Sequence, residues 1–155
     1  MRDPAQRPAT ILPPPLVYAG VLFGAWALQR RWPLLVEVGP VAPILGWAII
    51  ALGLAGMARA VLAIWGHKTT VNPYKQASHL VESGPFRYSR NPIYVSDWLV
   101  YLGVTLLLQS AWPLLLAPVV WALMRYAVIA HEETHLEAKF GDEYRAYQAR
   151  VRRWV

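Results

Sequence analysis

Four long apolar blocks constrain this chain more than any other feature of its sequence. They cover residues 16–28, 41–65, 93–108 and 113–130. A helix needs about 20 mostly apolar residues to cross the hydrocarbon core of a bilayer. Hydrophobic residues make up 56% of the 155 residues and charged residues only 15%, which is a poor match to a soluble domain. The sequence therefore predicts an all-α, polytopic membrane protein with about four transmembrane helices.

The blocks differ in how clearly they predict a span. The second is the clearest, because Arg59 is its only charge. Its residues Gly46, Gly53 and Gly56 predict close contact with a neighbouring helix. The last two blocks are separated only by residues 109–112, so they should form an antiparallel hairpin. The first block is short, and whether it spans fully is left open.

Lysine and arginine gather in two polar segments, 66–92 and 131–155, and are absent from the hairpin tip. The positive-inside rule places both segments in the cytoplasm, with the N-terminus on the same side of the inner membrane. Arg30 and Arg31 lie on the opposite side but are outnumbered. We attribute the net charge of +6 to lipid headgroups and membrane orientation and expect no nucleic-acid partner. The oligomeric state is left open.

The pattern divides the chain into N-terminal membrane helices, residues 1–65, and a second region, residues 66–155. The second region holds an interfacial loop, the helical hairpin 93–130 and cytoplasmic C-terminal helices. The last apolar helix should continue into water, with Gly141 as its stop. A further short helix is expected over 142–153.

Three charges fall within the apolar blocks. Asp97 and Arg125 are nearly equally far from the hairpin tip, and Arg59 is placed comparably on the second helix. Because a lone charge inside a membrane costs a few kcal/mol or more, such residues pair, face the protein or serve a site. Asp97 could pair with either arginine and join helices, or take part in a substrate site. Either arginine could also extend to the headgroups.

The segment richest in residues that could bind a ligand directly precedes the hairpin. Gly84-Pro85 predicts a turn, and Asn91-Pro92 predicts the start of a helix. Arginines and aromatic residues between them lie where the chain passes from water to lipid. This composition indicates either a loop that grips lipid phosphates or a loop that binds an anionic, adenine-containing ligand.

Two motifs flank the predicted hairpin. The first is Leu80-Val81-x-x-Gly84-Pro85-Phe86-Arg87-x-x-Arg90-Asn91-Pro92-x-Tyr94, and the second is Glu132-Glu133-x-x-Leu136-x-x-x-Phe140-Gly141-x-x-Tyr144-x-x-Tyr147. Together they resemble the isoprenylcysteine carboxyl methyltransferase family, to which phospholipid N-methyltransferases are related. The resemblance covers about residues 66–153 and depends on both motifs, since either alone is weak.

The resemblance implies a membrane enzyme that transfers a methyl group from S-adenosylmethionine to a lipophilic acceptor. The cofactor would lie between the loop and the base of the hairpin. Free N–H groups after Asn91 suit its carboxylate, and Glu132 suits its ammonium or ribose hydroxyls. The cofactor-binding residues so implied are Ser78, His79, Leu80, Val81, Gly84, Phe86, Arg87, Asn91, Pro92, Ile93, Tyr94 and Glu132.

The residues expected to orient the acceptor, in a catalytic role, are Arg90, Arg125 and Asp97. Eukaryotic members of the family carry an arginine one turn before the Glu132 position that contacts the substrate carboxylate, and here that position is Val128. The acceptor is therefore left open among an isoprenylcysteine-like carboxylate, an isoprenoid and a phospholipid.

Other functions compete with methyl transfer. A reductase of the sterol reductase type would use NADPH, and a lipid-binding scaffold would catalyse nothing. His131 and His135 are one helical turn apart, but no third ligand is well placed, so we expect no metal site. Glu133 is expected to be a solvated helix charge, and Tyr144 and Tyr147 to be packing residues.

Overall fold

The computed structural model describes residues 13–66 and 80–155. Throughout these ranges the regular structure is helical, which confirms the all-α prediction, and the one β-bridge is isolated. The elements are α1 (Pro14–Arg31), α2 (Ala42–Gly66), the 3₁₀-helix η2 (Gly84–Arg87), α3 (Pro92–Leu108), α4 (Trp112–Ala122), the π-helical η3 (Leu123–Ile129), α5 (Ala130–Phe140) and α6 (Asp142–Arg150).

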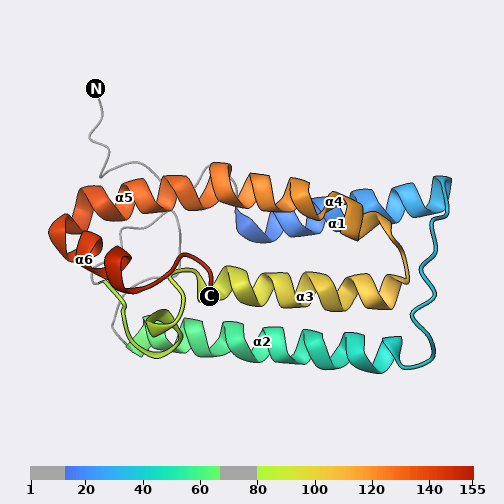
Figure 1. Cartoon of the computed structure of the whole chain (residues 1–155), viewed down its shortest axis with the longest axis horizontal. Coiled ribbons are helices and arrows are strands. Elements are labelled where there is room, and N and C mark those ends of the chain that lie inside the picture. The colour runs from blue at the N-terminus through green and yellow to red at the C-terminus, as the bar shows by residue number, and fades with distance from the viewer. Residues whose placement is uncertain (1–12, 67–79) are drawn as a thin grey trace.

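The long helices lie side by side in alternating directions (Figure 1). Helices α4, η3 and α5 follow one another without a break and form one long helix. Helix α3 runs back along α2, and α1 lies beside α4. Helix α6, η2 and the C-terminal tail gather at one end of the molecule, whereas the α1–α2 connection and the hairpin tip lie at the other.

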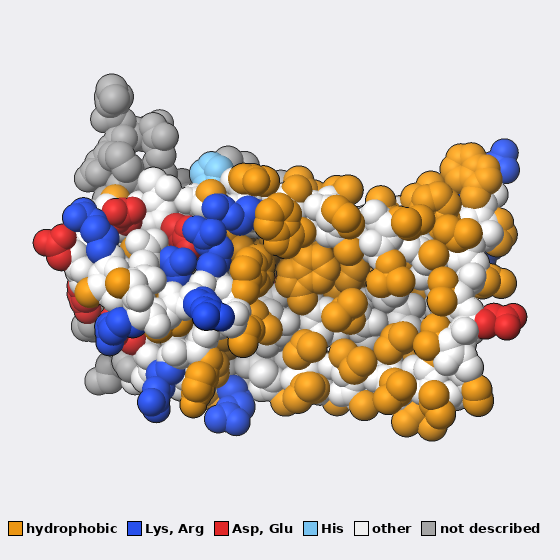
Figure 2. All heavy atoms as spheres, viewed as in Figure 1, with side chains coloured by type: hydrophobic (Ala, Val, Ile, Leu, Met, Phe, Trp, Pro, Cys, Tyr) orange, Lys and Arg blue, Asp and Glu red, His pale blue; other side chains and the backbone are white. Residues whose placement is uncertain are grey.

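Two of the described helices are long and apolar enough to cross a membrane: Ala42–Gly66 and the continuous helix Trp112–Phe140. Helix α3 is apolar but shorter, with 17 residues. Figure 2 shows apolar side chains covering most of the visible face, and charged side chains concentrated at the end that holds α5 and α6. This distribution is that of a protein whose apolar part faces lipid and whose charged end faces water.

Helices α2 and α3 approach closely because small residues line their interface. A Cβ atom on Gly103 would lie 2.7 Å from the Gly46 carbonyl oxygen, and one on Gly53 would lie 2.8 Å from the Ser96 carbonyl oxygen. A Cβ atom on Gly56 would lie 2.8 Å from Ser96 Oγ. The prediction of close contact through Gly46, Gly53 and Gly56 is confirmed.

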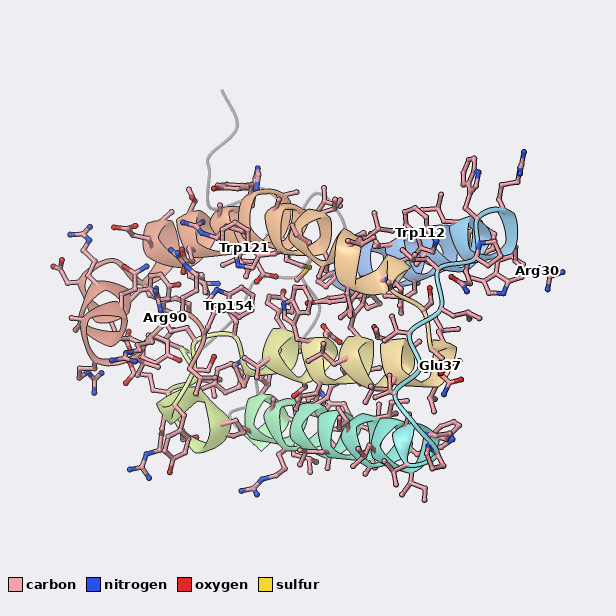
Figure 3. All side chains as sticks on the ribbon, turned by 45° about the vertical axis from the view of Figure 1, so that its right-hand side comes forward. Arg30, Glu37, Arg90, Trp112, Trp121 and Trp154 are labelled. Atoms are coloured by element: carbon pink, nitrogen blue, oxygen red, sulfur yellow. The ribbon has the colours of Figure 1, made fainter. Side chains whose placement is uncertain are left out.

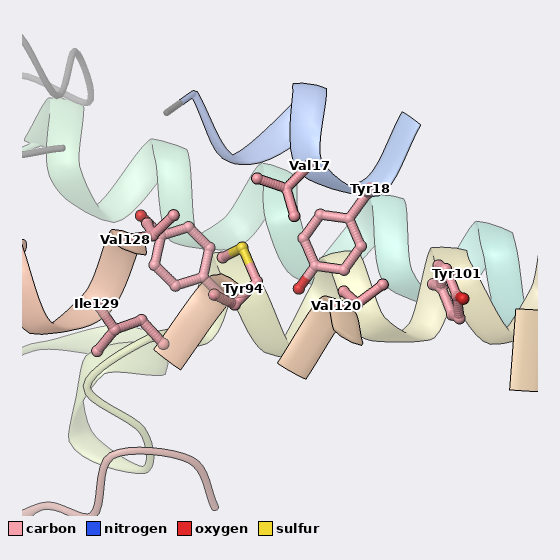
Figure 4. Packing of buried hydrophobic residues seen from close by; sticks show 8 residues of the cluster. Val17, Tyr18, Tyr94, Tyr101, Val120, Val128 and Ile129 are labelled. Carbon is pink, nitrogen blue, oxygen red and sulfur yellow. The ribbon is translucent and has the colours of Figure 1, made fainter. Parts of the chain in front are cut away.

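The buried core joins α1 to the hairpin. Its buried members are Val17, Tyr18, Tyr94, Tyr101, Val120, Met124, Val128 and Ile129, most of which Figure 4 labels. Tyr101 Oη donates a hydrogen bond to the Pro113 carbonyl oxygen at 2.6 Å, which fixes α3 against the start of α4. Helix α1 is therefore part of the same helical bundle as the second half of the chain.

Hydrogen bonds also fix the hairpin tip. Gln29 Oε1 accepts from Ser110 Oγ at 2.8 Å and from the Leu34 backbone N–H at 2.9 Å. Trp112 Nε1 donates to the Trp32 carbonyl oxygen at 2.8 Å. The end of α1 and the tip of the hairpin are thus held together at the end of the bundle opposite α6.

Two features of the C-terminal region differ from expectation. The helix expected over 142–153 ends at Arg150, because Val151 takes an extended conformation (φ −121°, ψ 130°) and the tail turns back. The long helix contains the π-helical segment η3, which no local pattern predicted. Gly141, with φ +52°, ends α5 as expected.

Candidate active site

A short hydrogen bond joins the two motifs that flank the hairpin. Tyr94 Oη donates to Glu132 Oε1 at 2.6 Å. Tyr94 lies in the first turn of α3 and Glu132 in the first turn of α5, 38 residues later. An O–H···O⁻ bond of this length is typical of a charge-assisted pair. The start of the hairpin and the polar extension of its last helix therefore meet at one place.

The next residue, Glu133, binds two arginines. Its Oε1 lies 3.1 Å from Arg90 Nη1, and Arg153 donates to it through Nε at 2.9 Å and Nη2 at 2.7 Å. The side chains of Arg90 and Glu133 are only 11% and 14% exposed. The hydrogen bonds that Arg153 donates to Glu133 raise the pKa of Arg153 above its ordinary value. The expectation that Glu133 is a solvated charge is therefore wrong, because the tail returns to cover it.

Backbone carbonyls of the tail hold the loop that precedes α3. Asn91 Nδ2 donates to the Arg153 carbonyl oxygen at 2.9 Å, and Ser89 Oγ donates to the same oxygen at 3.3 Å. The Arg90 backbone N–H donates to the Arg152 carbonyl oxygen at 2.9 Å. Trp154 packs against the core cluster, and Figure 3 shows it close to Arg90. We call residues 151–155 with these contacts the tail clasp.

Helix α6 covers η2. Tyr147 Oη donates to the Phe86 carbonyl oxygen at 2.8 Å, and both Tyr144 and Tyr147 are buried. The expectation that these tyrosines pack is confirmed. Burial raises the pKa of both phenols, so they stay neutral at physiological pH. The loop is thus enclosed by α6 and by the tail clasp.

The expected cofactor residues differ in burial. Ser78 and His79 lie outside the described residues. Glycine suits position 84, where φ is +59°. Arg87 is exposed. The remaining members are buried or half-buried along the loop and the starts of α3 and α5: Leu80, Val81, Phe86, Asn91, Pro92, Ile93, Tyr94 and Glu132.

Four buried polar atoms have no hydrogen-bond partner within the described chain: Tyr18 Oη, Arg90 Nε, Arg90 Nη1 and His135 Nδ1. Of these, Arg90 Nη1 still lies in ion-pair contact with Glu133. Arg90 shares the Glu133 contact, and His135 follows Glu132 by three residues, on the same face of α5. Tyr18 and Tyr94 belong to the same buried core cluster. Because buried polar atoms are nearly always bonded, such a group of unpaired atoms indicates a binding site. The sequence analysis considered His135 only as a metal ligand and did not select Tyr18 at all. The three-residue spacing between Glu132 and His135 was the signal that could have placed His135 in this site.

Asp97 does not form the ion pair with Arg125 or Arg59 that one of the alternatives predicted. In the described part of the chain, no ion pair joins Asp97 to Arg125 or to Arg59. Arg59 is exposed, and the Arg125 guanidinium lies 5.5 Å from the ring centre of Tyr126, a side chain that is 62% exposed. A similar distance from the hairpin tip was therefore insufficient to predict an ion pair.

These observations define the class: a helical protein with an apolar body and a polar, partly enclosed site at one end of the bundle. The chain belongs to the phospholipid methyltransferase family, whose model matches residues 41–143. The family agrees with the resemblance drawn from the two motifs. Helix α1 and the tail clasp lie outside the matched residues.

Two curated proteins are similar to the chain. One is the cobalt-zinc-cadmium resistance protein CzcN of Cupriavidus metallidurans, 31% identical over 135 residues, which are 87% of this chain and 56% of CzcN. The other is an uncharacterized protein of Haemophilus influenzae, 43% identical over 63 residues, which are 41% of this chain and all of that protein. No solved structure is significantly similar. Among the described residues, no group of three or more His, Asp or Glu residues is arranged to hold a metal ion.

Proposed function

We propose that the protein is an integral membrane methyltransferase that uses S-adenosylmethionine to methylate a lipophilic acceptor. The observation that carries the proposal is the Tyr94–Glu132 hydrogen bond, in a chain that belongs to the phospholipid methyltransferase family. It joins the two motifs at the end of the bundle where the apolar surface gives way to charge. A polar cofactor from the cytosol and a lipid from the bilayer would meet there.

The residues at this place fit the cofactor chemically. Asn91 makes no side-chain capping bond to α3, so the backbone N–H groups of Ile93 and Tyr94 are open to a carboxylate. Tyr94 engages one carboxylate oxygen of Glu132, which leaves Oε2 for an ammonium or for ribose hydroxyls. The unpaired nitrogen of His135 supplies a further hydrogen-bonding atom. When bound, the cofactor supplies a methyl group already attached to a good leaving group.

The protein's task is then alignment and exclusion of water. The Tyr94 hydroxyl orients the Glu132 carboxylate. The tail clasp and the Glu133 ion pairs hold the loop against the start of α3. Of the three residues expected to act on the acceptor, Arg90 is engaged with Glu133 and Arg125 lies beside an exposed tyrosine. Asp97 is therefore the one that we assign to the acceptor.

In the proposed membrane arrangement all four long helices cross the bilayer, with the site and both termini at the cytoplasmic face. The continuous last helix has 29 residues and, at 1.5 Å per residue, is longer than a hydrocarbon core of about 30 Å. Its polar end, α5, would therefore project into the cytoplasm. The concentration of arginine around α6 and the tail supports this orientation.

The experiment is methyl transfer by the purified full-length protein in lipid nanodiscs, with methyl-labelled S-adenosylmethionine and a membrane lipid extract. Label should appear in a lipid product, and Glu132→Gln should abolish it. Thermal shifts with S-adenosylhomocysteine and with NADPH provide the comparison. Stabilisation by NADPH alone would identify a reductase. Failure of both ligands to stabilise the protein, together with no labelled lipid, would leave a lipid-binding scaffold.

A further inference from the structure

The hydroxyl of Tyr18 is held in the core without a partner. The Tyr18 side chain on α1 is 7% exposed. Its ring packs edge-on against Trp98, with centres 5.9 Å apart, and against Tyr101, with centres 6.2 Å apart. Two such contacts fix the direction of the hydroxyl. Figure 4 shows the Tyr18 ring beside Val17 and Val120. Its oxygen is buried and makes no hydrogen bond within the described chain.

The other two tyrosines of the core cluster provide a contrast. Tyr94 donates to Glu132, and Tyr101 donates to the Pro113 carbonyl oxygen, both at 2.6 Å. An unpaired buried hydroxyl costs free energy that a phenylalanine at the same position would avoid. Packing therefore accounts for the ring of Tyr18 but not for its hydroxyl.

The surroundings of Tyr18 point to the acceptor side of the proposed site. Asp97 directly precedes Trp98 on α3, and the Trp98 ring packs against Tyr18. Tyr18 and Tyr94 belong to the same buried core cluster. Tyr94 and Asp97 are three residues apart, on one face of α3. Tyr18 thus lies near the Tyr94–Glu132 pair, on an element that packs against the membrane-embedded part of the bundle.

We propose, on the basis of the proposed function, that Tyr18 and Asp97 bind the polar head of the methyl acceptor, so that α1 completes the acceptor side of the site. The Tyr18 hydroxyl orients the head, and the Asp97 carboxylate accepts a hydrogen bond or a proton from it. A head that donates hydrogen bonds, such as an amine or a thiol, fits this pair. A carboxylate head does not, because it would face the Asp97 carboxylate, which pairs with no cation among the described residues.

The transfer step follows from this placement. The acceptor's lone pair forms a bond to the methyl carbon, and the carbon–sulfur bond breaks with its electron pair passing to sulfur. Before this attack, an ammonium or thiol head gives one proton to Asp97, because a protonated amine has no lone pair. Tyr18 is a specificity-determining residue in this step, and its hydroxyl stays intact throughout.

The test measures methyl transfer by the full-length protein in phosphatidylcholine vesicles that contain one of three additives with the same chain: stearylamine, stearyl mercaptan or stearic acid. We expect labelled amine or thioether and little methyl ester. Tyr18→Phe should raise the acceptor KM by about five- to tenfold, the usual effect of losing one hydrogen bond. Its affinity for S-adenosylhomocysteine should stay unchanged, and its Tm should stay the same or rise, because no protein hydrogen bond is lost and an unpaired buried hydroxyl is removed.

Tyr101→Phe is the matched control, because it removes a hydroxyl that bonds within the protein. It should lower Tm and leave the acceptor KM unchanged. Preferential formation of the methyl ester, or an unchanged acceptor KM in an active Tyr18→Phe protein, overturns this inference alone. A wild-type protein that binds no S-adenosylhomocysteine and methylates no lipid overturns the proposed function and this inference with it.

Discussion

Arg153 binds Glu133 through both Nε and Nη2, at 2.9 and 2.7 Å, and so attaches the last residues of the chain to the first turn of α5. The same carboxylate holds Arg90, in the loop before α3. One glutamate therefore connects three segments that are far apart in the sequence. The conformation of the loop before α3 should therefore depend on residues 151–155.

Arg153→Ala should lower both stability and cofactor affinity. Removal of one partner from a partly buried, hydrogen-bonded ion pair costs about 2–3 kcal/mol. Thermal unfolding and titration with S-adenosylhomocysteine measure the two effects. Arg153→Lys should restore only part of the loss, because an ammonium cannot form the two-point contact.

Arg150→Ala is the control for this prediction. Arg150 Nη2 lies 2.8 Å from Glu82 Oε2, but its side chain is 64% exposed. An exposed ion pair contributes less than about 1 kcal/mol. Equal losses from the Arg150 and Arg153 substitutions would contradict a specific role for the tail clasp.

Tyr94→Phe should weaken cofactor binding while the protein stays folded. The substitution frees the Glu132 carboxylate to rotate and leaves it without its hydrogen-bond donor. Because a hydrogen bond to a charged group contributes about 1.5–3 kcal/mol, a loss of roughly tenfold or more in affinity is expected. Calorimetric titration with S-adenosylhomocysteine checks this. Affinity equal to that of the wild type would remove Tyr94 from the site.

Gly53→Leu should separate α2 from α3. Even a Cβ atom at this position would lie 2.8 Å from the Ser96 carbonyl oxygen, and backbone cannot move aside as a side chain can. Overpacking of this kind costs about 1–3 kcal/mol. Thermal unfolding in detergent measures the loss. Gly24→Leu on α1 is the control, since a Cβ atom there meets nothing within 4 Å.

Gly141→Ala should strain the junction of α5 and α6. Gly141 has φ +52° and ψ −121°, a conformation that residues with a Cβ atom rarely adopt. A cost of about 1–3 kcal/mol is expected. Because α6 covers η2, the substitution should also expose Tyr147, which a rise in hydrogen exchange at residues 84–90 would detect. Unchanged exchange there would show that α6 contributes little to the enclosure of the loop.

The sequence predicted the helices and the meeting of the two motifs because both depend on local pattern. Apolar length located the helices to within a few residues, and the short tip required an antiparallel hairpin, which brings Tyr94 and Glu132 to the same end. The partners of the charged side chains were harder to predict from the sequence. Glu133 reads as solvated until its contact with Arg90, 43 residues earlier, is known.

The charges in the apolar blocks illustrate the same limit. Counting from the tip gives depth along a helix but not the direction in which a side chain points. Asp97 and Arg125 are nearly equally far from the tip in the sequence, yet no ion pair joins them. The turn of the tail after Arg150 had no local signal either, because Arg152 and Arg153 would also suit a longer helix.

The π-helical segment η3 sets the rotational phase of everything that follows it. A π-helical turn holds more residues than an α-helical turn, so η3 accommodates its extra length within the helix. In the regular α-helix that follows, each residue advances the chain by about 100°, so one residue inserted between Ala130 and Glu132 would swing Glu132 away from Tyr94. The length of the last helix is therefore as much a part of the site as its side chains. An insertion between η3 and Glu132 should therefore disrupt the site, whereas substitution of the exposed Tyr126 within η3 should be tolerated.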